Sequence, residues 1–346
     1  MSVAQMVLGF WDIAVPIVGA PMAGGPGSPA LAAAVSNAGG LGFVAGGYLS
    51  ADQLADDIAA ARAATTGPLG VNLLVPQPSV ADWVQLDYYH YELEEFADHY
   101  RVEVGQPESG DDDDWERKLE VVADVHPELV SFTFGVPSPD VIARLGALGI
   151  LVMVTVTSAY EAGVAVAAGA DSLVVQGPDA GGHRGTFAPD MDPGTESLND
   201  LIARIRKAHN VPIIAAGGLG TAEDVSAVLH RGAVAAQVGT ALLLSDEAGT
   251  HPAHRTAMKN QLFGRTIVTR AFSGRYARGL ENEFIRILDD VAPLGYPEVH
   301  QMTLPIREAA ADSEDPNGMT LWAGTSFAEA QTGPAADIVA GLAADY

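Results

Sequence analysis

The stretch that decides the fold is VPIIAAGGLGTAEDVSAVLHRGAVAAQVGT, residues 211–240. It contains two short apolar runs, at residues 211–215 and 234–238, separated by a segment whose apolar residues have helical spacing. Thr221 precedes that segment and Asp224 follows three positions later, a pattern typical of a capped helix N-terminus. A buried strand, a capped helix and a second buried strand predict a βαβ unit with parallel strands.

The same alternation continues toward the N-terminus, where short β-branched runs alternate with alanine-rich segments of helical period. Eight strands are predicted at residues 15–18, 41–44, 69–74, 129–134, 150–155, 172–176, 211–215 and 234–238. Helices are predicted at residues 28–37, 51–64, 115–125, 139–148, 158–168, 197–208 and 221–230. Eight strands in this alternation predict a TIM (β/α)8 barrel, because a doubly wound sheet usually stops at five or six.

Two connections are longer than the ordinary unit. The starts of strands three and four lie 60 residues apart, and those of strands six and seven 39 residues apart. The first gap contains aromatic and acidic sequence, so we predict a helical insertion over residues 80–125. Residues 241–346 follow strand eight and are predicted to form C-terminal helices and a lid, including the stretch 264–284. Because there is no short-period repeat and no linker, residues 1–346 are predicted to form a single elaborated domain.

Charge and composition exclude several classes of function. The chain has 44 acidic and 18 basic residues, a formal net charge of −26. Such a surface repels nucleic-acid phosphates and anionic lipid headgroups, so we expect neither nucleic acid nor membrane as a partner. The chain has no cysteine, which excludes disulfides, thiolate metal sites and cysteine nucleophiles.

The N-terminal region has no targeting signal that we can identify. The first basic residue is Arg62, whereas secretory signals and transit peptides need positive charge near the start. Between Asp12 and Asp52 there is no charge, but four prolines and nine glycines would break a membrane-spanning helix. We therefore expect a cytoplasmic protein.

Glycine clusters follow the last two predicted strands. They are GGLG at residues 217–220 and QVGT at residues 237–240. Loops in these positions of a barrel commonly bind phosphate through backbone N–H groups. A third cluster, GAPMAGG at residues 19–25, would let a flat ring approach the backbone closely. The alternative is that these glycines serve only the tight turns between strands and helices.

Three amide side chains lie in or at the end of predicted strands: Asn72, Gln176 and Gln237. Each can donate and accept hydrogen bonds, which suits a ring with alternating donors and acceptors. Together with a single phosphate site they indicate FMN. The alternative for each amide is that it only satisfies a neighbouring backbone group.

His183 is the candidate catalytic residue, because it lies in the glycine-flanked loop Gly181–Gly185 directly after a strand. The alternative is a structural histidine. His251 and His254 are three residues apart, but we interpret them as surface residues and predict no metal site. The acidic run at residues 111–114 is interpreted as a solvated loop. No lysine lies at a strand end, which argues against Schiff-base chemistry.

Seven ordered blocks of the sequence resemble class I nitronate monooxygenases, a family of FMN-dependent TIM-barrel enzymes. The blocks are residues 16–42, 70–78, 131–137, 175–187, 215–221, 237–250 and 272–282. They extend over nearly the whole chain and are specific as a set. One departure is Gly19, where the family commonly has glutamine.

The resemblance implies a cofactor, a substrate class and a set of site residues. FMN contacts are implied at Met22, Asn72, Gln176, Gly181, Gly218, Gln237, Val238, Gly239 and Thr240. His183 is implied as the base, or as the group that stabilises a nitronate. The implied reaction is oxidation of alkyl nitronates, and of nitroalkanes, by O2 to carbonyl compounds and nitrite, with detoxification of propionate 3-nitronate as the role the family suggests.

An anionic substrate would need local positive charge in so acidic a protein, and Arg184, Arg275 and Arg278 are candidates. Other functions stay open at this point. The nearest is a flavin-dependent NAD(P)H:quinone or enoyl-thioester reductase on the same barrel. A non-redox, phosphate-binding lyase or isomerase and a non-enzymatic binding module are further alternatives.

Overall fold

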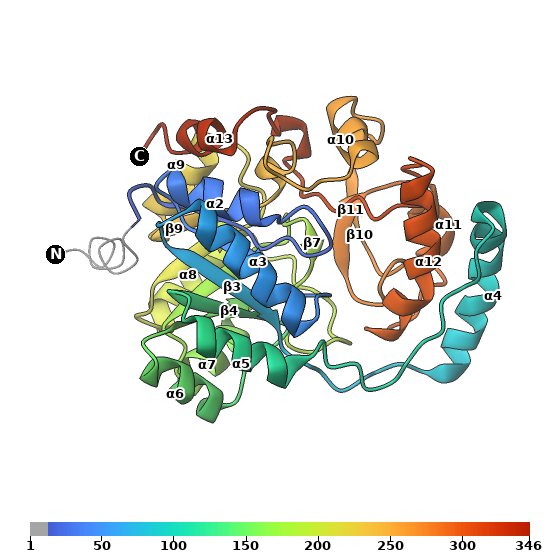
Figure 1. The fold of residues 1–346 in the computed structure, drawn as a ribbon, viewed down its shortest axis with the longest axis horizontal. Helices are drawn as coiled ribbons and strands as arrows, with labels where there is room; N and C mark the ends of the chain where they lie inside the picture. The colour runs from blue at the N-terminus through green and yellow to red at the C-terminus, as the bar shows by residue number, and fades with distance from the viewer. Residues whose placement is uncertain (1–12) are drawn as a thin grey trace.

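The computed structural model describes residues 13–346, and its centre is an eight-stranded parallel sheet that curves into a nearly closed barrel (Figure 1). The strands are β1 (Ile17–Gly19), β2 (Gly42–Ala45), β3 (Leu69–Leu74), β4 (Leu129–Thr133), β5 (Leu151–Val156), β6 (Ser172–Gln176), β8 (Ile213–Ala216) and β9 (Ala235–Val238). Their order is β1-β9-β8-β6-β5-β4-β3-β2. A parallel bridge between Val18 and Leu41 joins the first and last strands of that order. The predicted TIM barrel is therefore confirmed.

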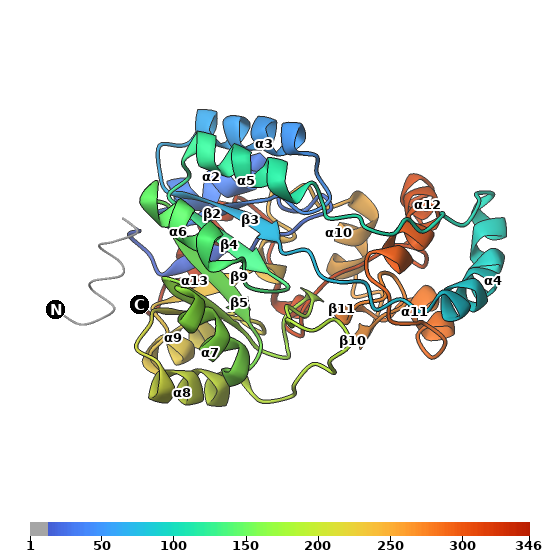
Figure 2. The ribbon, with the colours of Figure 1, turned by 90° about the horizontal axis from the view of Figure 1, so that it is seen from below.

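Helices on the outside of the barrel alternate with these strands (Figure 2). They are α2 (Pro29–Asn37), α3 (Ala51–Ala64), α5 (Trp115–Val125), α6 (Pro139–Ala147), α7 (Ala159–Ala168), α8 (Leu198–Ala208) and α9 (Ala222–His230). Their capping follows the sequence: Ser50 and Gln53 form a capping box at α3, and Thr221 and Asp224 form another at α9. The last helix, α13 (Ala335–Leu342), packs against α2 and α9.

Side chains along each strand point alternately to the helices outside the barrel and into its interior, so the core has two layers. In β3, Leu69, Val71 and Leu73 belong to the cluster between barrel and helices. Asn72 therefore points to the opposite side, into the barrel. The barrel interior is filled by a smaller cluster that includes Phe43, whose ring lies so close to Gly70 that a Cβ there would be 2.4 Å away.

A second part of the molecule lies beyond the carboxyl ends of the strands (Figure 2). It contains α4 (Trp83–Tyr100), α10 (Pro252–Lys259), α11 (Glu283–Leu288) and α12 (Glu298–Asp312), and α4 packs on α12. It also contains a three-stranded sheet, β10-β11-β7, of β10 (Thr266–Thr269), β11 (Ala277–Leu280) and β7 (Gly182–His183). Short 3₁₀ turns lie at Thr240–Leu242 and Phe327–Glu329.

The prediction of helices for residues 264–284 was wrong in part, because β10 and β11 form an antiparallel pair there. The segments TIVT of β10 and ARGL of β11 pair with each other, and β7, which lies in the loop after β6, adds a third strand beside β11. The division into one domain with an insertion at 80–125 and a C-terminal segment at 241–346 stays a prediction. Within residues 13–346, no helix is long and apolar enough to cross a membrane.

The close contact between α2 and β2 generates a stability prediction. A Cβ on Gly42 would lie 1.8 Å from the Ala32 carbonyl oxygen, which is backbone and cannot rotate away. We expect Gly42→Ala to lower the free energy of unfolding by about 1–3 kcal/mol or more, measured by urea unfolding.

The matched control for this experiment is Gly146→Ala in α6, where nothing lies within 4 Å of the new Cβ. It should raise the free energy of unfolding by about 0.4–1 kcal/mol. Equal effects of the two substitutions would contradict the packing argument.

Candidate active site

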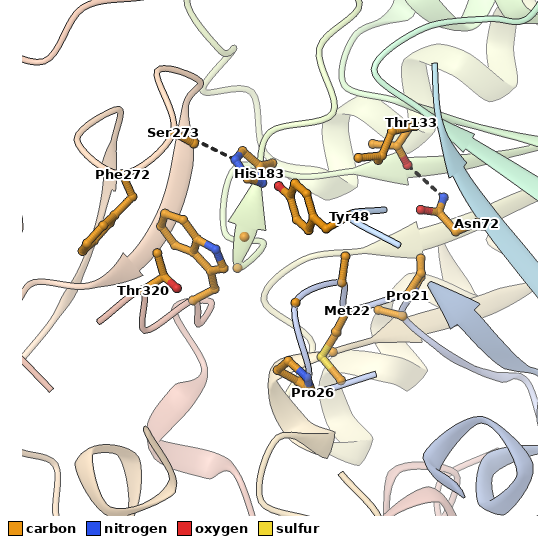
Figure 3. A pocket seen from close by; sticks show the side chains of 18 of the residues that line it. Pro21, Met22, Pro26, Tyr48, Asn72, Thr133, His183, Phe272, Ser273 and Thr320 are labelled. Atoms are coloured by element: carbon orange, nitrogen blue, oxygen red, sulfur yellow. Dashed lines mark hydrogen bonds between the residues drawn. The ribbon is translucent and has the colours of Figure 1, made fainter. Parts of the chain in front are cut away.

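A large cavity of about 1210 Å³ opens at the carboxyl ends of the strands, between the barrel and the second part of the molecule (Figure 3). All ten predicted site residues line it: Met22, Asn72, Gln176, Gly181, His183, Gly218, Gln237, Val238, Gly239 and Thr240. They come from five strand ends and the loops that follow. The structure therefore brings together residues that are far apart in the sequence.

The glycine clusters after β8 and β9 form one end of the cavity. Gly218 has φ +75°, and no acceptor within the described residues pairs with the backbone N–H of Gly218, Leu219 or Gly239. The tail of the chain closes this end: Ser326 Oγ donates to the Gly218 carbonyl at 2.7 Å, and Gly324 N donates to Thr240 Oγ1 at 2.9 Å. The sequence did not point to either tail residue, because nothing in a run of small residues indicates which loop it contacts.

Two of the three predicted amides, Asn72 and Gln176, differ in the hydrogen bonds that they make. Asn72 Nδ2 donates to Ser131 Oγ at 2.9 Å and to Thr133 Oγ1 at 3.1 Å, while its Oδ1 accepts no hydrogen bond from the described residues. Gln176 is satisfied at both ends by its own loop, since Nε2 donates to the His183 carbonyl at 3.0 Å and Oε1 accepts from Gly185 N at 2.9 Å. Gln176 thus holds the loop that carries His183.

The residues present fit FMN. Unpaired backbone N–H groups beside two glycine loops are donors of the kind that bind a single phosphate. A Cβ on Gly239 would lie 3.3 Å from the Ala20 side chain and 3.5 Å from Met22 Sδ, so the loops after β1 and β9 meet at one wall of the cavity. The free Asn72 Oδ1 and the Gln237 amide line the same cavity and can pair with ring donors and acceptors.

His183 lies in β7, which pairs with β11, so the second sheet fixes its backbone. Its Nε2 is 2.8 Å from Ser273 Oγ, and that Oγ is 3.1 Å from the Arg275 carbonyl, to which it can donate (Figure 3). Three aromatic rings surround the imidazole: Phe134, Tyr296 and Trp322, with centroids 5.6–5.8 Å away. These rings and Ser273 restrict the orientation of the imidazole, which still lines the cavity.

The charge state of His183 follows from these surroundings. Burial, with smaller contributions from the nearby guanidinium groups of Arg275 and Arg307, lowers the pKa of the imidazole to about 3. The imidazole is neutral at pH 7, and so it can accept a proton or a hydrogen bond.

The three arginines predicted as an anion site do not act alike. Arg184 donates to the carbonyls of Gly177 and Gln176, and Arg278 donates to the Pro178 carbonyl through two nitrogens. Their guanidinium groups hold the loop after β6. Arg275 lies 3.8 Å over the Phe134 ring, and its Nε and Nη1 have no partner within the described residues. Arg184 Nε also has no partner among the described residues, and none of the three arginines lines the cavity, so the predicted direct anion site is not formed by them.

Sequence reasoning missed several residues beside His183, all from the second part of the molecule or the loop after β2. Arg307 of α12 donates to Thr303 Oγ1 at 3.0 Å and to the His300 carbonyl at 2.9 Å, and it lines the cavity. Tyr48 stacks on His300 with ring centroids 4.5 Å apart. No sequence motif marks these positions, because α12 reaches the cavity only through its packing on α4.

Two further interpretations of the sequence were wrong. His254 is buried, 5% exposed, and not a surface residue, because α10 packs it into the cavity wall. The acidic run is not simply solvated: Asp113 accepts from Tyr48 N at 2.9 Å and pairs with the buried Lys118 at 2.8 Å. Within residues 13–346, no group of three or more potential side-chain ligands could hold a metal ion.

Comparison with known proteins gives one consistent likeness. A family model described as nitronate monooxygenase matches residues 8–345. A nitronate monooxygenase of Paraburkholderia phytofirmans is 37% identical over 345 residues, covering 94% of this chain and 91% of that protein. A probable nitronate monooxygenase of Staphylococcus saprophyticus is 34% identical over 331 residues, covering 94% of this chain and 93% of that protein.

Solved structures agree with this likeness. The nitroalkane oxidase of Streptomyces ansochromogenes superposes with a TM-score of 0.93 at 44% identity, covering 99% of this chain and 97% of that one. FabK of Thermotoga maritima superposes with a TM-score of 0.75 at 26% identity, covering 97% and 94%.

Buried neutral histidines predict that stability depends on pH. Burial lowers the pKa of His254 from the ordinary value of 6.5 to about 4, with a smaller contribution from His251 in the same direction. Below pH 6.5 the unfolded chain therefore binds a proton that the folded chain does not, and stability falls as the pH falls. Between pH 6.5 and 5.0 this histidine alone should contribute a loss of about 1.5 kcal/mol.

The measurement is urea unfolding at pH 6.5, 5.75 and 5.0 of the wild type and of His254→Leu. The variant should lose less stability over this window than the wild type. Parallel curves would show that His254 titrates normally in the folded protein.

Proposed function

This chain belongs to the nitronate monooxygenase family of oxidoreductases, and on that premise we propose that it is an FMN-dependent enzyme that oxidises alkyl nitronates with O2 to carbonyl compounds and nitrite. Nitroalkanes would be substrates after loss of their α-proton. The observation that carries the proposal is the neutral His183 imidazole, which lines the same cavity as an unpaired set of backbone N–H donors.

The proposed FMN site uses the residues that line the inner part of the cavity. The backbone N–H groups of Gly218, Leu219 and Gly239 would hold the phosphate. Asn72 Oδ1 and the Gln237 amide would face the ring, beside Met22. When bound, the flavin accepts electrons from the nitronate and passes them to O2.

We assign His183 the role of base toward nitroalkanes; the Nδ1–H that forms when it takes the α-proton can then donate to a nitro oxygen of the nitronate. Since Ser273 Oγ can donate to the Arg275 carbonyl, it can accept from the Nε2–H of His183. That tautomer leaves Nδ1 unprotonated and able to take the α-proton. Ser273, 2% exposed, acts here as a positioning residue that sets the tautomer and the orientation of the ring.

The cations beside His183 suit the charge of a nitronate. A nitronate carries its negative charge largely on the nitro oxygens, and Arg275, although it does not line the cavity, is close enough to His183 to place a positive field there. A bound anion would also offset the repulsion that Arg275 and Arg307 exert on a protonated His183, and so raise its pKa during the reaction. We propose propionate 3-nitronate as a substrate, with Arg307 as partner of its carboxylate.

The first experiment tests cofactor and reaction together. We expect the purified protein to bind FMN, to show the absorbance of an oxidised flavin, and to release nitrite from ethyl nitronate in air. Failure to bind added FMN would contradict the proposal. A likeness to FabK makes the reductase the main alternative; rapid anaerobic bleaching of the flavin by NADH, without nitronate oxidation, would support it.

Replacing the imidazole tests the role of His183. We expect His183→Asn to keep its FMN and to lose about 10²- to 10⁴-fold in turnover of nitroethane, because proton transfer contributes that much to rate. The loss with ethyl nitronate should be smaller, since that substrate has already lost its proton. Ser273→Ala is the companion variant and should reduce turnover less than His183→Asn. Wild-type rates on both substrates with His183→Asn would refute the assignment.

A further inference from the structure

The cavity is larger than a cofactor site alone. Pockets that hold one drug-sized ligand have volumes of about 300–1,000 Å³, and this one has about 1210 Å³. Part of its wall lies beyond the residues assigned to phosphate, ring and imidazole. We call this part the outer arm; its wall comes from α10 with the segment before it, from the second half of α12 and from the tail. Figures 1 and 2 place α10 and α12 in the same outlying part of the molecule.

One side of the outer arm is apolar. It includes Leu304 and Ala311 of α12 and Met319 of the tail, all lining the cavity. Ala311, Met319 and Met22 pack in one hydrophobic cluster with Ala253 and Met258 of α10, so these elements meet at one place. Met22 also lines the proposed ring site (Figure 3). The outer arm therefore continues from the reacting region toward the outside.

The other side of the outer arm contains two polar atoms without a partner. The side chains of Thr250 and His254 are each 5% exposed, and within the described residues Thr250 Oγ1 and His254 Nε2 have no hydrogen-bond partner. Buried polar atoms are nearly always paired, so each unpaired one requires an explanation. Both residues line the cavity, where a bound molecule can supply the partner.

The chemistry of these atoms restricts the ligand. A hydroxyl and a neutral imidazole can each donate or accept a hydrogen bond but carry no charge. Arg307 and Glu308 of α12 both line the cavity, so this wall has no net charge that would attract an ionic group. A ligand with an apolar chain and a neutral polar group can pack its chain on the apolar side of the outer arm and pair its polar group with Thr250 and His254.

We propose that the outer arm binds the unbranched aliphatic tail of an extended substrate, and that His254 and Thr250 pair with a neutral hydroxyl or amide group carried by that tail. The proposal rests on the proposed function only for the reaction at the other end of the molecule. The proposal adds a substrate class, long-chain nitronates with a neutral polar group in the tail. It also assigns the selection of these substrates to His254 and Thr250.

The apolar part is tested with ethyl, butyl and octyl nitronate on the FMN-loaded protein. Burial of a methylene in the outer arm should lower KM by up to about fourfold for each group added. Ala311→Phe fills the outer arm and should raise KM for octyl nitronate at least tenfold, with ethyl nitronate changed less than twofold. Leu262→Phe is the matched control, because Leu262 is 53% exposed and lies outside the cavity.

The polar part is tested with His254→Phe and with 8-hydroxyoctyl nitronate beside octyl nitronate. The wild type should prefer the hydroxylated substrate by about 2- to 10-fold in KM, the value of one net hydrogen bond, and the variant should lose that preference. The Kd for FMN should not change. A weaker Kd for FMN with an unchanged preference would assign His254 to the cofactor site and overturn the proposal.

Calorimetric titration of the FMN-loaded protein with 1-octanol gives a readout that does not depend on turnover. Binding that Ala311→Phe weakens at least tenfold supports the outer arm even if no nitronate is oxidised, an outcome that would contradict the proposed function alone. Turnover of all three nitronates with equal KM, together with no binding of 1-octanol, would overturn the outer arm and leave the proposed function intact.

Discussion

The anchoring of the loop after β6 is the constraint on which the site depends. This loop leaves the barrel at Gln176 and becomes a strand of the second sheet at His183. Glu161, 2% exposed, accepts from Phe187 N at 2.8 Å and from Thr157 N and Oγ1, which fixes the return of the loop to the barrel. Together with Gln176, which donates to the His183 carbonyl and accepts from Gly185 N, this anchoring joins β7 to the barrel wall and sets the direction of the imidazole.

The anchoring of this loop uses buried charged side chains, whose removal from water costs free energy unless they find suitable partners. Arg184 and Arg275 are each 1% exposed, and Glu161 is close enough to raise the pKa of both guanidinium groups, against the larger lowering by burial. A buried cation is tolerated only when hydrogen bonds and an opposite charge replace its water. The loop carbonyls of Gly177 and Thr186 supply those hydrogen bonds. The same residues therefore hold the loop and place positive charge beside His183.

The barrel and most of the inner site could be predicted from the sequence, because both depend on local patterns. Residues 69–74 and 172–176 were predicted as strands with the bounds that the structure has, since both are short apolar runs, followed closely by Pro76 and directly by Gly177. His183 could be found because glycines flank it after a strand. Arg307, Tyr48 and Ser273 could not be placed, because they reach His183 through tertiary packing and the pairing of β7 with β11, which no local pattern encodes.

The tail contacts at the glycine loops have a consequence for assembly. Ser326 and Gly324 contact Gly218 and Thr240, so the C-terminal segment joins the loops after β8 and β9 at one end of the cavity. A ligand seated there would bind best when this C-terminal segment is docked, and by mass action its binding energy would be added to the docking equilibrium. Binding at this end of the cavity would thus keep residues 324–326 attached to the barrel.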